Sequence, residues 1–121
     1  MITLFGINNC DTVKKAQKWL NNENVAYNFY DFKKQPLTPE ILTQFVNLSN
    51  WRLLLNKRST TYRNLNDEIK NDLTDEHAFE QALLQPTLLK RPLLLIEKEN
   101  NKQLYLGFKP ENYQTIFKEN K

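Results

Sequence analysis

The sequence predicts an α/β protein built on an open mixed sheet with helices on its faces, and three observations indicate it. Two short β-favouring segments near the N-terminus flank an amphipathic helix, which is typical of a parallel strand pair. Two apolar segments near the C-terminus surround a polar turn, which is typical of a β-hairpin. Helical patterns fill the stretch between them. We expect one domain over residues 1–121, with a helical insert at approximately 38–87.

The first half of the sheet is predicted from two segments. Residues 2–6, ITLFG, are apolar and end at a glycine, so we expect a buried strand. The helix that follows, 11–24, repeats apolar side chains at helical spacing, with Asp11 or Thr12 as the expected N-cap. Residues 25–32 alternate and are rich in aromatic side chains, as in a second strand. Because a helix joins the two strands, they are expected to be parallel with a right-handed crossover.

The middle of the chain is predicted to be helical. In the segment 37–48, Thr38 and then Pro39 favour the first positions of a helix. Residues 50–65 are irregular, and we expect a short helix followed by a loop there. Two further helices are predicted at 66–73 and 75–85, the second with Asp75 as its cap.

The C-terminal part completes the sheet. Residues 91–108 predict two strands around the polar turn 99–102, and residues 109–120 predict a closing helix with Pro110 near its start. The order is therefore βαβ, a helix, a helical insert, then ββα. This order, with a cysteine directly after the first strand, is the arrangement of thioredoxin-like proteins, here with an inserted helical subdomain.

Composition and charge exclude several classes of function. The net charge of +3 is mild and the lysines are mixed with acids, so no direct nucleic-acid binding is expected. The longest apolar block, 92–96, is too short to cross a membrane, and the N-terminus lacks a signal-peptide pattern. A single cysteine excludes an internal disulfide, and one histidine, His77, cannot complete a metal site. We therefore expect a cytoplasmic monomer with no bound cofactor and no metal.

Cys10 is the residue most suited to chemistry. A thiol becomes nucleophilic when it ionises, and the unpaired N–H groups at a helix N-terminus stabilise the thiolate. The amides at Asp11 and Thr12 could point at the sulfur, or hold an anionic oxygen of a substrate. The alternative is a cysteine that packs as a small apolar residue. The polar neighbours of Cys10 and its position in a strand-to-helix loop favour the reactive thiol.

The segment KRPLLLI, residues 90–96, is the second informative stretch. Pro92 opens a predicted strand, and a proline at that place is often in the cis form. Arg91 could reach the Cys10 loop and hold an oxyanion or a carboxylate through its fork of N–H donors. The alternatives, a surface arginine and a proline that only starts a strand, remain open on spacing alone.

Four segments together carry a resemblance to a known family: GINNCDT at 6–12, NKRSTTYRNL at 56–65, KRPLLLI at 90–96 and LGFKPENY at 106–113. Over essentially its whole length the chain resembles the arsenate reductase (ArsC) family, and most closely its YffB-like subgroup of glutathione-dependent thiol reductases. The family also includes the Spx transcription regulators. The resemblance implies a thioredoxin-like fold, Cys10 as nucleophile, and Arg91-Pro92 as a cis-proline turn.

The sequence also departs from the family pattern. Members that reduce arsenate place three arginines around the cysteine, and the matching positions here are Asn56, Arg91 and Lys109. Those members also carry a histidine four residues before the cysteine, where this chain has Gly6. A lysine supplies charge but not the planar fork of arginine. The resemblance therefore implies that arsenate is held poorly.

Arg58 offers a replacement for the missing charge. It matches an arginine of the N-x-R-x-T-T pattern of the YffB-like proteins, and a comparable arginine occurs in Spx regulators. The resemblance implies that Arg58 could swing toward Cys10, or bind a carboxylate of glutathione. Its alternative is an ion pair within the insert, with Asp67 or Glu68.

Two classes of function are consistent with these residues. The first is a monothiol oxidoreductase that uses Cys10 as nucleophile and external glutathione as reductant, because no second cysteine can resolve a mixed disulfide. The second is an Spx-like regulatory protein that binds RNA polymerase or another protein partner. A C-x-x-C redox switch is excluded, because the segment CDTV has no second cysteine.

Overall fold

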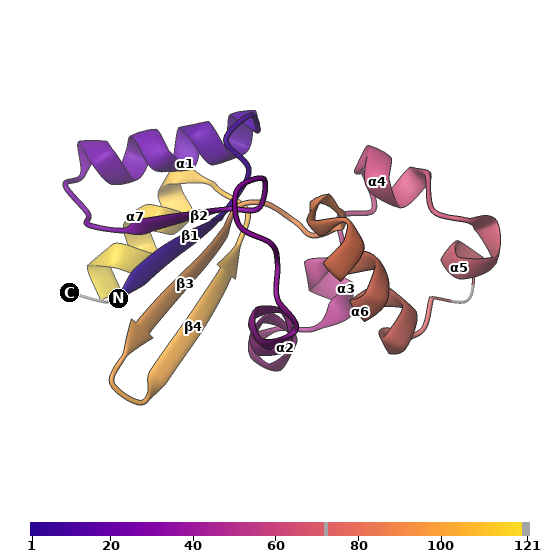
Figure 1. Cartoon of the computed structure of the whole chain (residues 1–121). Helices are drawn as coiled ribbons and strands as arrows, with labels where there is room; N and C mark the ends of the chain where they lie inside the picture. The colour runs from indigo at the N-terminus through magenta and orange to yellow at the C-terminus, as the bar shows by residue number, and fades with distance from the viewer. Residues whose placement is uncertain (72, 120–121) are drawn as a thin grey trace. The chain divides into compact units, whose positions relative to one another are not determined.

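The computed structural model describes residues 1–71 and 73–119. The predicted helices 66–73 and 109–120 each include one residue, Asp72 and Asn120, outside this description. The chain forms two compact units, one from Met1–Lys33 with Arg91–Lys121 and one from Lys34–Lys90 (Figure 1).

The first unit contains a four-stranded sheet in the order β2-β1-β3-β4. Its strands are β1 (Ile2–Gly6), β2 (Asn28–Asp31), β3 (Leu93–Lys98) and β4 (Asn101–Leu106). Strand β1 pairs parallel with β2 and antiparallel with β3, and β4 pairs antiparallel with β3. The predicted parallel pair and hairpin are thus confirmed. The second strand is shorter than predicted, because residues 25–27 and Phe32 lie outside the ladder.

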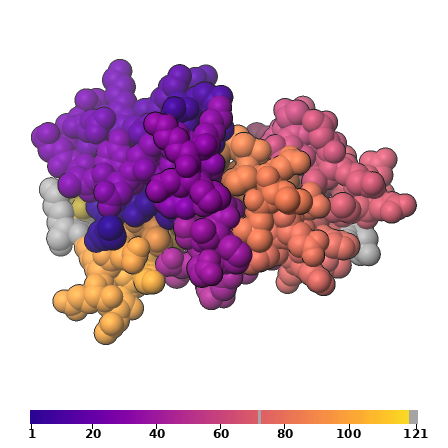
Figure 2. Space-filling model, viewed as in Figure 1, coloured from indigo at the N-terminus to yellow at the C-terminus, as the bar shows by residue number. Residues whose placement is uncertain are grey.

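Two helices, α1 (Asp11–Asn22) and α7 (Pro110–Glu119), pack against the sheet around one core (Figure 1). Alternating positions of β1 and β3 face this core, as expected for strands with one helix-covered face. Its buried members are Leu4, Val13, Ala16, Leu20, Leu94, Ile96, Tyr113 and Ile116. In the space-filling view, side chains of α1 and of the β3–β4 hairpin are visible on the surface of this unit (Figure 2).

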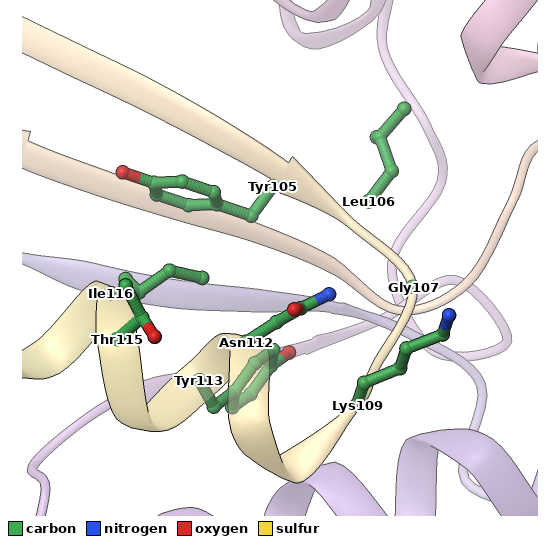
Figure 3. A pocket seen from close by; sticks show the side chains of 8 residues that line it. All are labelled: Tyr105, Leu106, Gly107, Lys109, Asn112, Tyr113, Thr115 and Ile116. Carbon is green, nitrogen blue, oxygen red and sulfur yellow. The ribbon is translucent and has the colours of Figure 1, made fainter.

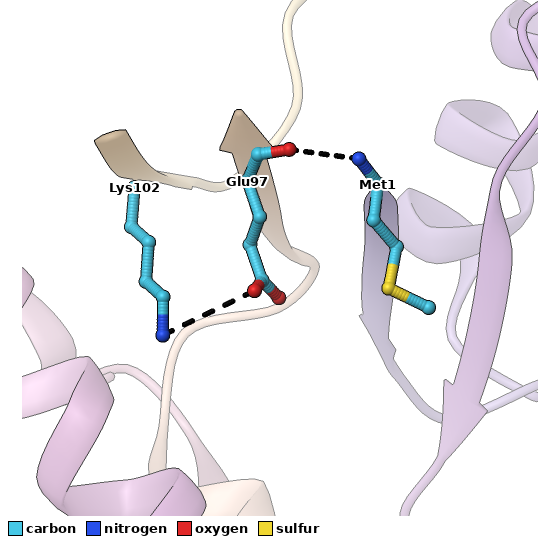
Figure 4. Close-up of polar contacts among 3 residues, drawn as sticks. All are labelled: Met1, Glu97 and Lys102. Carbon is cyan, nitrogen blue, oxygen red and sulfur yellow. Dashed lines mark hydrogen bonds and ion pairs between the residues drawn. The ribbon is translucent and has the colours of Figure 1, made fainter. Parts of the chain in front are cut away.

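The hairpin is tighter than predicted. Residues Asn101 and Lys102 already belong to β4 and pair with β3, so the turn consists of Glu99 and Asn100. Near the same end of β3, the N-terminal ammonium group of Met1 donates to the carbonyl oxygen of Glu97 at 2.7 Å (Figure 4). The Lys102 ammonium lies 4.0 Å from the Glu97 carboxylate, an exposed pair that contributes little to stability.

The second unit is helical. It comprises α2 (Pro39–Leu48), α3 (Trp51–Leu54), α4 (Thr60–Arg63), α5 (Asp67–Asn71), α6 (Asp75–Leu84) and a 3-10 turn at Pro86–Leu88. The stretch 50–65 holds two short helices, where a short helix and a loop were predicted. The cap of α6 is Thr74, whose hydroxyl accepts from the His77 N–H at 3.1 Å, so the prediction of Asp75 is wrong by one residue. Threonine and aspartate both cap helices well, so the sequence alone did not show which of these two adjacent residues is the cap.

Candidate active site

The register of the sheet brings three predicted site segments to one edge. Phe5 pairs with Leu93, and Leu93 pairs with Leu106. Strands β1 and β4 therefore end at the edge where β3 begins. The loop into α1, the turn before β3 and the link into α7 all emerge there (Figure 1). These segments carry Cys10, Arg91 with Pro92, and Lys109.

Cys10 is the N-cap of α1. Its backbone is extended, with φ −97° and ψ 124°, and its carbonyl oxygen accepts from the Lys14 N–H at 3.0 Å. The prediction that Asp11 or Thr12 caps this helix is wrong, because both already lie inside it. The Cys10 side chain is half-buried against the core, and it accepts no hydrogen bond from the first turn.

The first turn of α1 leaves its amides open. Within the described residues, the N–H groups of Asp11, Thr12 and Val13 have no acceptor. Such amides, together with the helix dipole, stabilise a negative charge placed beside them. The Asp11 side chain is exposed and that of Thr12 is half-buried. The anion-binding role predicted for these two residues therefore depends on their backbone N–H groups, and it stays a prediction.

Gly6 fixes how closely α1 approaches β1. A Cβ atom built at Gly6 would lie 2.8 Å from Cγ2 of Val13, a distance that real Cβ contacts do not reach. Val13 is buried and β-branched, so its side chain has few alternative rotamers. The position that holds a histidine in arsenate-reducing relatives therefore has no room for a side chain here. Sequence reasoning missed this constraint, which involves a tertiary distance.

The turn before β3 has the predicted form, because the Arg91-Pro92 peptide bond is cis. Pro92 is buried, and its carbonyl oxygen accepts from the Gly107 N–H at 2.9 Å, which ties the turn to the end of β4. Arg91 is half-buried, and its Nε atom is closed off from solvent. The predicted roles of Arg91 and Pro92 in binding stay predictions.

Lys109 precedes α7 and is exposed. Its carbonyl oxygen accepts from the N–H groups of Asn112 at 3.0 Å and Tyr113 at 3.1 Å. Lys109 also lines a cavity of about 320 Å³ between the end of β4 and the first turns of α7 (Figure 3). Cys10 is not among the residues that line this cavity. Binding of a substrate anion by Lys109 stays a prediction.

Arg58 belongs to the second unit, where Asn56 organises the turn that carries it. The Asn56 Oδ1 atom accepts from the Arg58 N–H at 3.2 Å, and the Asn56 carbonyl oxygen accepts from the Ser59 N–H at 3.0 Å. Arg58 is exposed. The alternative ion pair is absent, since within the described part of the chain Arg58 contacts neither the Asp67 nor the Glu68 carboxylate. The asparagine found where relatives have an arginine thus has a structural role.

Two buried polar residues were missed by sequence reasoning. Asp31 ends β2 opposite Gly6, is 5% exposed, and accepts from the Lys33 N–H at 2.9 Å. Tyr113 is 1% exposed, and burial raises the pKa of its phenol well above the ordinary value. An aspartate that ends a strand is the only sequence signal for the first. Nothing in the sequence distinguishes Tyr113 from the other aromatic residues near it.

The described residues hold neither a metal-binding cluster nor a membrane-spanning helix. Within residues 1–71 and 73–119, no cluster of three or more His, Cys, Asp or Glu side chains could hold a metal ion. In the same residues, no helix is long and apolar enough to cross a membrane.

The strand order, the helices on the sheet and the helical insertion define the fold as thioredoxin-like. The solved structure of the protein YFFB (PA3664) matches with a TM-score of 0.84 and 38% identity, covering 95% of this chain and 97% of that one. The fold predicted from the element order is thus confirmed.

Sequence comparison identifies the family. The model of the ArsC family matches residues 5–116, and the chain belongs to this family. An uncharacterized protein of Haemophilus influenzae is 44% identical over 117 residues, covering 97% of this chain and 99% of that protein. The global transcriptional regulator Spx of Lactiplantibacillus plantarum is 30% identical over 100 residues, covering 81% of this chain and 75% of the regulator. The family resemblance inferred from the motifs is confirmed.

Proposed function

We propose that the protein is a monothiol oxidoreductase that uses Cys10 as its nucleophile and glutathione as its external reductant. The placement of Cys10 carries the proposal. It caps α1 beside three amides that have no acceptor within the described residues, and its own side chain accepts no bond from them. A thiolate at this position gains stabilisation from the amides and the helix dipole, and a thiolate is the reactive form.

The chemistry at Cys10 consists of two thiol–disulfide exchanges. The Cys10 thiolate attacks one sulfur of a substrate disulfide, so that a Cys10 mixed disulfide forms and the other sulfur leaves as a thiolate. A glutathione thiolate then attacks the mixed disulfide, which releases an oxidised product and restores the Cys10 thiolate. The oxidised product is the mixed disulfide of glutathione with the substrate half that Cys10 held. A second glutathione thiolate in solution exchanges with it, which frees the second substrate thiol and leaves oxidised glutathione, so that two glutathione molecules supply the two electrons. An external thiol is required because the chain has one cysteine.

Arginine and lysine side chains would hold the anionic groups of the reactants. Arg91 and Lys109 emerge from the same sheet edge as Cys10, and Arg58 is exposed on its turn in the second unit. A tetrahedral dianion such as arsenate needs more charge than this set supplies around the thiol. We therefore expect little arsenate reduction in an NADPH assay coupled through glutathione and glutaredoxin. Asn56→Arg combined with Lys109→Arg should raise it.

Mass spectrometry after exposure to oxidised glutathione tests the proposal. We expect the folded protein to form the Cys10 adduct faster than the urea-denatured chain, because only the folded chain has the α1 amides in place. The pH midpoint of iodoacetamide labelling should likewise lie below that of the denatured chain. Cys10→Ser serves as the blank. Equal rates and equal midpoints in the folded and denatured chains would rule the proposal out.

A second candidate is a regulatory protein, and the relation to Spx favours it. In this case the chain would bind RNA polymerase or another protein, and the thiol would be unnecessary for binding. A pull-down with purified RNA polymerase separates the candidates, because Cys10→Ser should bind as well as the wild type if the protein is a regulator. Absence of binding by both forms would leave the oxidoreductase alone.

A further inference from the structure

The cavity between β4 and α7 is a second candidate binding site in the first unit. Its volume of about 320 Å³ lies in the range of pockets that hold small molecules. Figure 3 shows side chains from the end of β4 and from one side of α7 around it. The lining residues are Tyr105, Leu106, Gly107, Lys109, Asn112, Tyr113, Thr115 and Ile116.

Three of the lining residues carry a hydroxyl group, and two of these hydroxyls are already committed. The Tyr105 hydroxyl donates to the Gln103 Oε1 atom at 2.7 Å, and the Thr115 hydroxyl donates to the Glu111 carbonyl oxygen at 3.1 Å. The Tyr113 hydroxyl has no hydrogen-bond partner within the described residues, although its side chain is only 1% exposed. A buried hydroxyl without a partner is rare in folded proteins and requires an explanation.

The direction of the Tyr113 hydroxyl indicates from where a ligand would reach it. In Figure 3 the Tyr113 hydroxyl is directed toward the Gly107 end of the cavity, beside the side chain of Asn112. The oxygen itself is closed off from solvent, whereas Asn112 is exposed. A ligand that reaches this hydroxyl therefore requires a neighbouring side chain to move, and Asn112 is the exposed neighbour drawn beside it (Figure 3).

The charge of the lining favours an anion. No acidic residue lines the cavity, and the Lys109 side chain runs beside Gly107 at its rim (Figure 3). Within the described residues, Lys109 has no carboxylate partner. The α7 amides of Asn112 and Tyr113 donate to the Lys109 carbonyl oxygen, so side chains are the main groups that would recognise a ligand. Leu106 and Ile116 supply apolar walls.

We propose that this cavity binds a small carboxylate with an apolar body. The Tyr113 hydroxyl donates a hydrogen bond to one carboxylate oxygen, and the Lys109 ammonium contributes positive charge at the rim. The apolar body lies against Leu106 and Ile116. Binding at this site does not require the thiol chemistry of Cys10, and the two proposals can therefore fail separately.

Titration of the Cys10→Ser protein with phenylacetate, followed by NMR of its backbone amides, tests the proposal. We expect saturable shifts of amides between Gly107 and Ile116, with a dissociation constant at or below about 10 mM. Phenylacetamide has the same body without the charge, and it should bind about tenfold more weakly. Absence of saturable shifts, or equal binding of the two compounds, would overturn the proposal.

Substitutions in the same protein identify the contacts. Tyr113→Phe keeps the buried ring, so the fold should persist, and phenylacetate should bind about tenfold more weakly. Lys109→Gln should weaken binding about threefold, whereas Lys118→Gln, which removes a lysine from the far end of α7, should leave it unchanged. Unchanged binding by Tyr113→Phe, or equal effects of the two lysine substitutions, would exclude the site.

Discussion

Two helices of the first unit begin at the same edge of the sheet, and they begin differently. At α1 the cap is Cys10, and the three amides that follow have no acceptor within the described residues. At α7 the first residue is Pro110, which has no N–H group. Further into α7, the N–H groups of Asn112 and Tyr113 both donate to the Lys109 carbonyl oxygen.

The difference shows where backbone can stabilise negative charge. The start of α1 presents three N–H donors beside a thiol, whereas the start of α7 presents the Lys109 side chain and one N–H, that of Glu111, without an acceptor in the described residues. The helices of the second unit support this contrast. The N-caps of helices α2, α3, α4 and α6 are Thr38, Asn50, Ser59 and Thr74, and each of these side chains accepts an N–H of its own helix. The cysteine cap of α1 leaves that position open.

Cys10→Ser should produce the largest effect. Glutathione adduct formation should disappear completely, since the chain has no other thiol. The free energy of unfolding, measured in urea, should also rise by about 0.5–1 kcal/mol, because a serine hydroxyl can accept an N–H of the first turn as Thr38 does in α2. A Cys10→Ser protein less stable than the wild type would show that the α1 amides are not open to a cap.

Gly6→Ala should disturb the start of α1 more than any change at its surface. The new methyl group would overlap Cγ2 of Val13, so we expect a loss of about 1–3 kcal/mol in the free energy of unfolding. The displaced first turn should also slow formation of the Cys10 adduct. Thr38→Ala is a matched control, because it costs about 1 kcal/mol by removing the α2 cap in the other unit. If both variants slowed the adduct equally, general destabilisation would explain the effect.

The buried phenol of Tyr113 in α7 should make the free energy of unfolding depend on pH. Burial raises the pKa of this phenol, so the folded chain keeps a proton that the unfolded chain loses above its ordinary value of about 10. Stability from this group is therefore full below pH 10 and falls by about 1.4 kcal/mol for each further pH unit. Urea unfolding between pH 9 and 11 measures this loss of stability. Tyr113→Phe is the reference, because it lacks the contribution of this phenol. Parallel curves for the two proteins would contradict the assignment.

The fold could be predicted because its elements follow local rules. Apolar alternation and helical periodicity located the strands and helices, and the cysteine after the first strand identified their arrangement. The errors lie where neighbouring residues compete for one role. Cys10 and Asp11 are adjacent at the start of α1, as Thr74 and Asp75 are at α6, and only the backbone angles decide which residue lies outside the helix.

The candidate site could be predicted only in part. A lone cysteine and an Arg-Pro pair are visible in the sequence, and the sheet register places them at one edge. The contact between Gly6 and Val13, in contrast, depends on a distance between a strand and a helix. The unpartnered hydroxyl of Tyr113 depends on which face of α7 is covered. Such facts arise from packing, and no local pattern in a single sequence records them.

The smallest expected effect is that of removing the Lys109 charge, which at the start of α7 corresponds to the open amides at the start of α1. If α7 supports an anion near the shared edge only through this side chain, Lys109→Gln should slow the reaction of Cys10 with oxidised glutathione about threefold at low salt. The reaction with a neutral disulfide, 2-hydroxyethyl disulfide, should hardly change, because it carries no charge for the lysine to attract. Both rates are measured by alkylating the unreacted Cys10 thiol in samples quenched at successive times.

Lys118→Gln is the control, because it changes the net charge equally at the other end of α7. Raising the salt concentration to about 1 M should remove the difference between Lys109→Gln and the wild type, since screening then acts within a few ångströms. A threefold loss that persists at high salt, or that appears equally with the neutral disulfide, would mean that Lys109 acts through the structure of the α7 start.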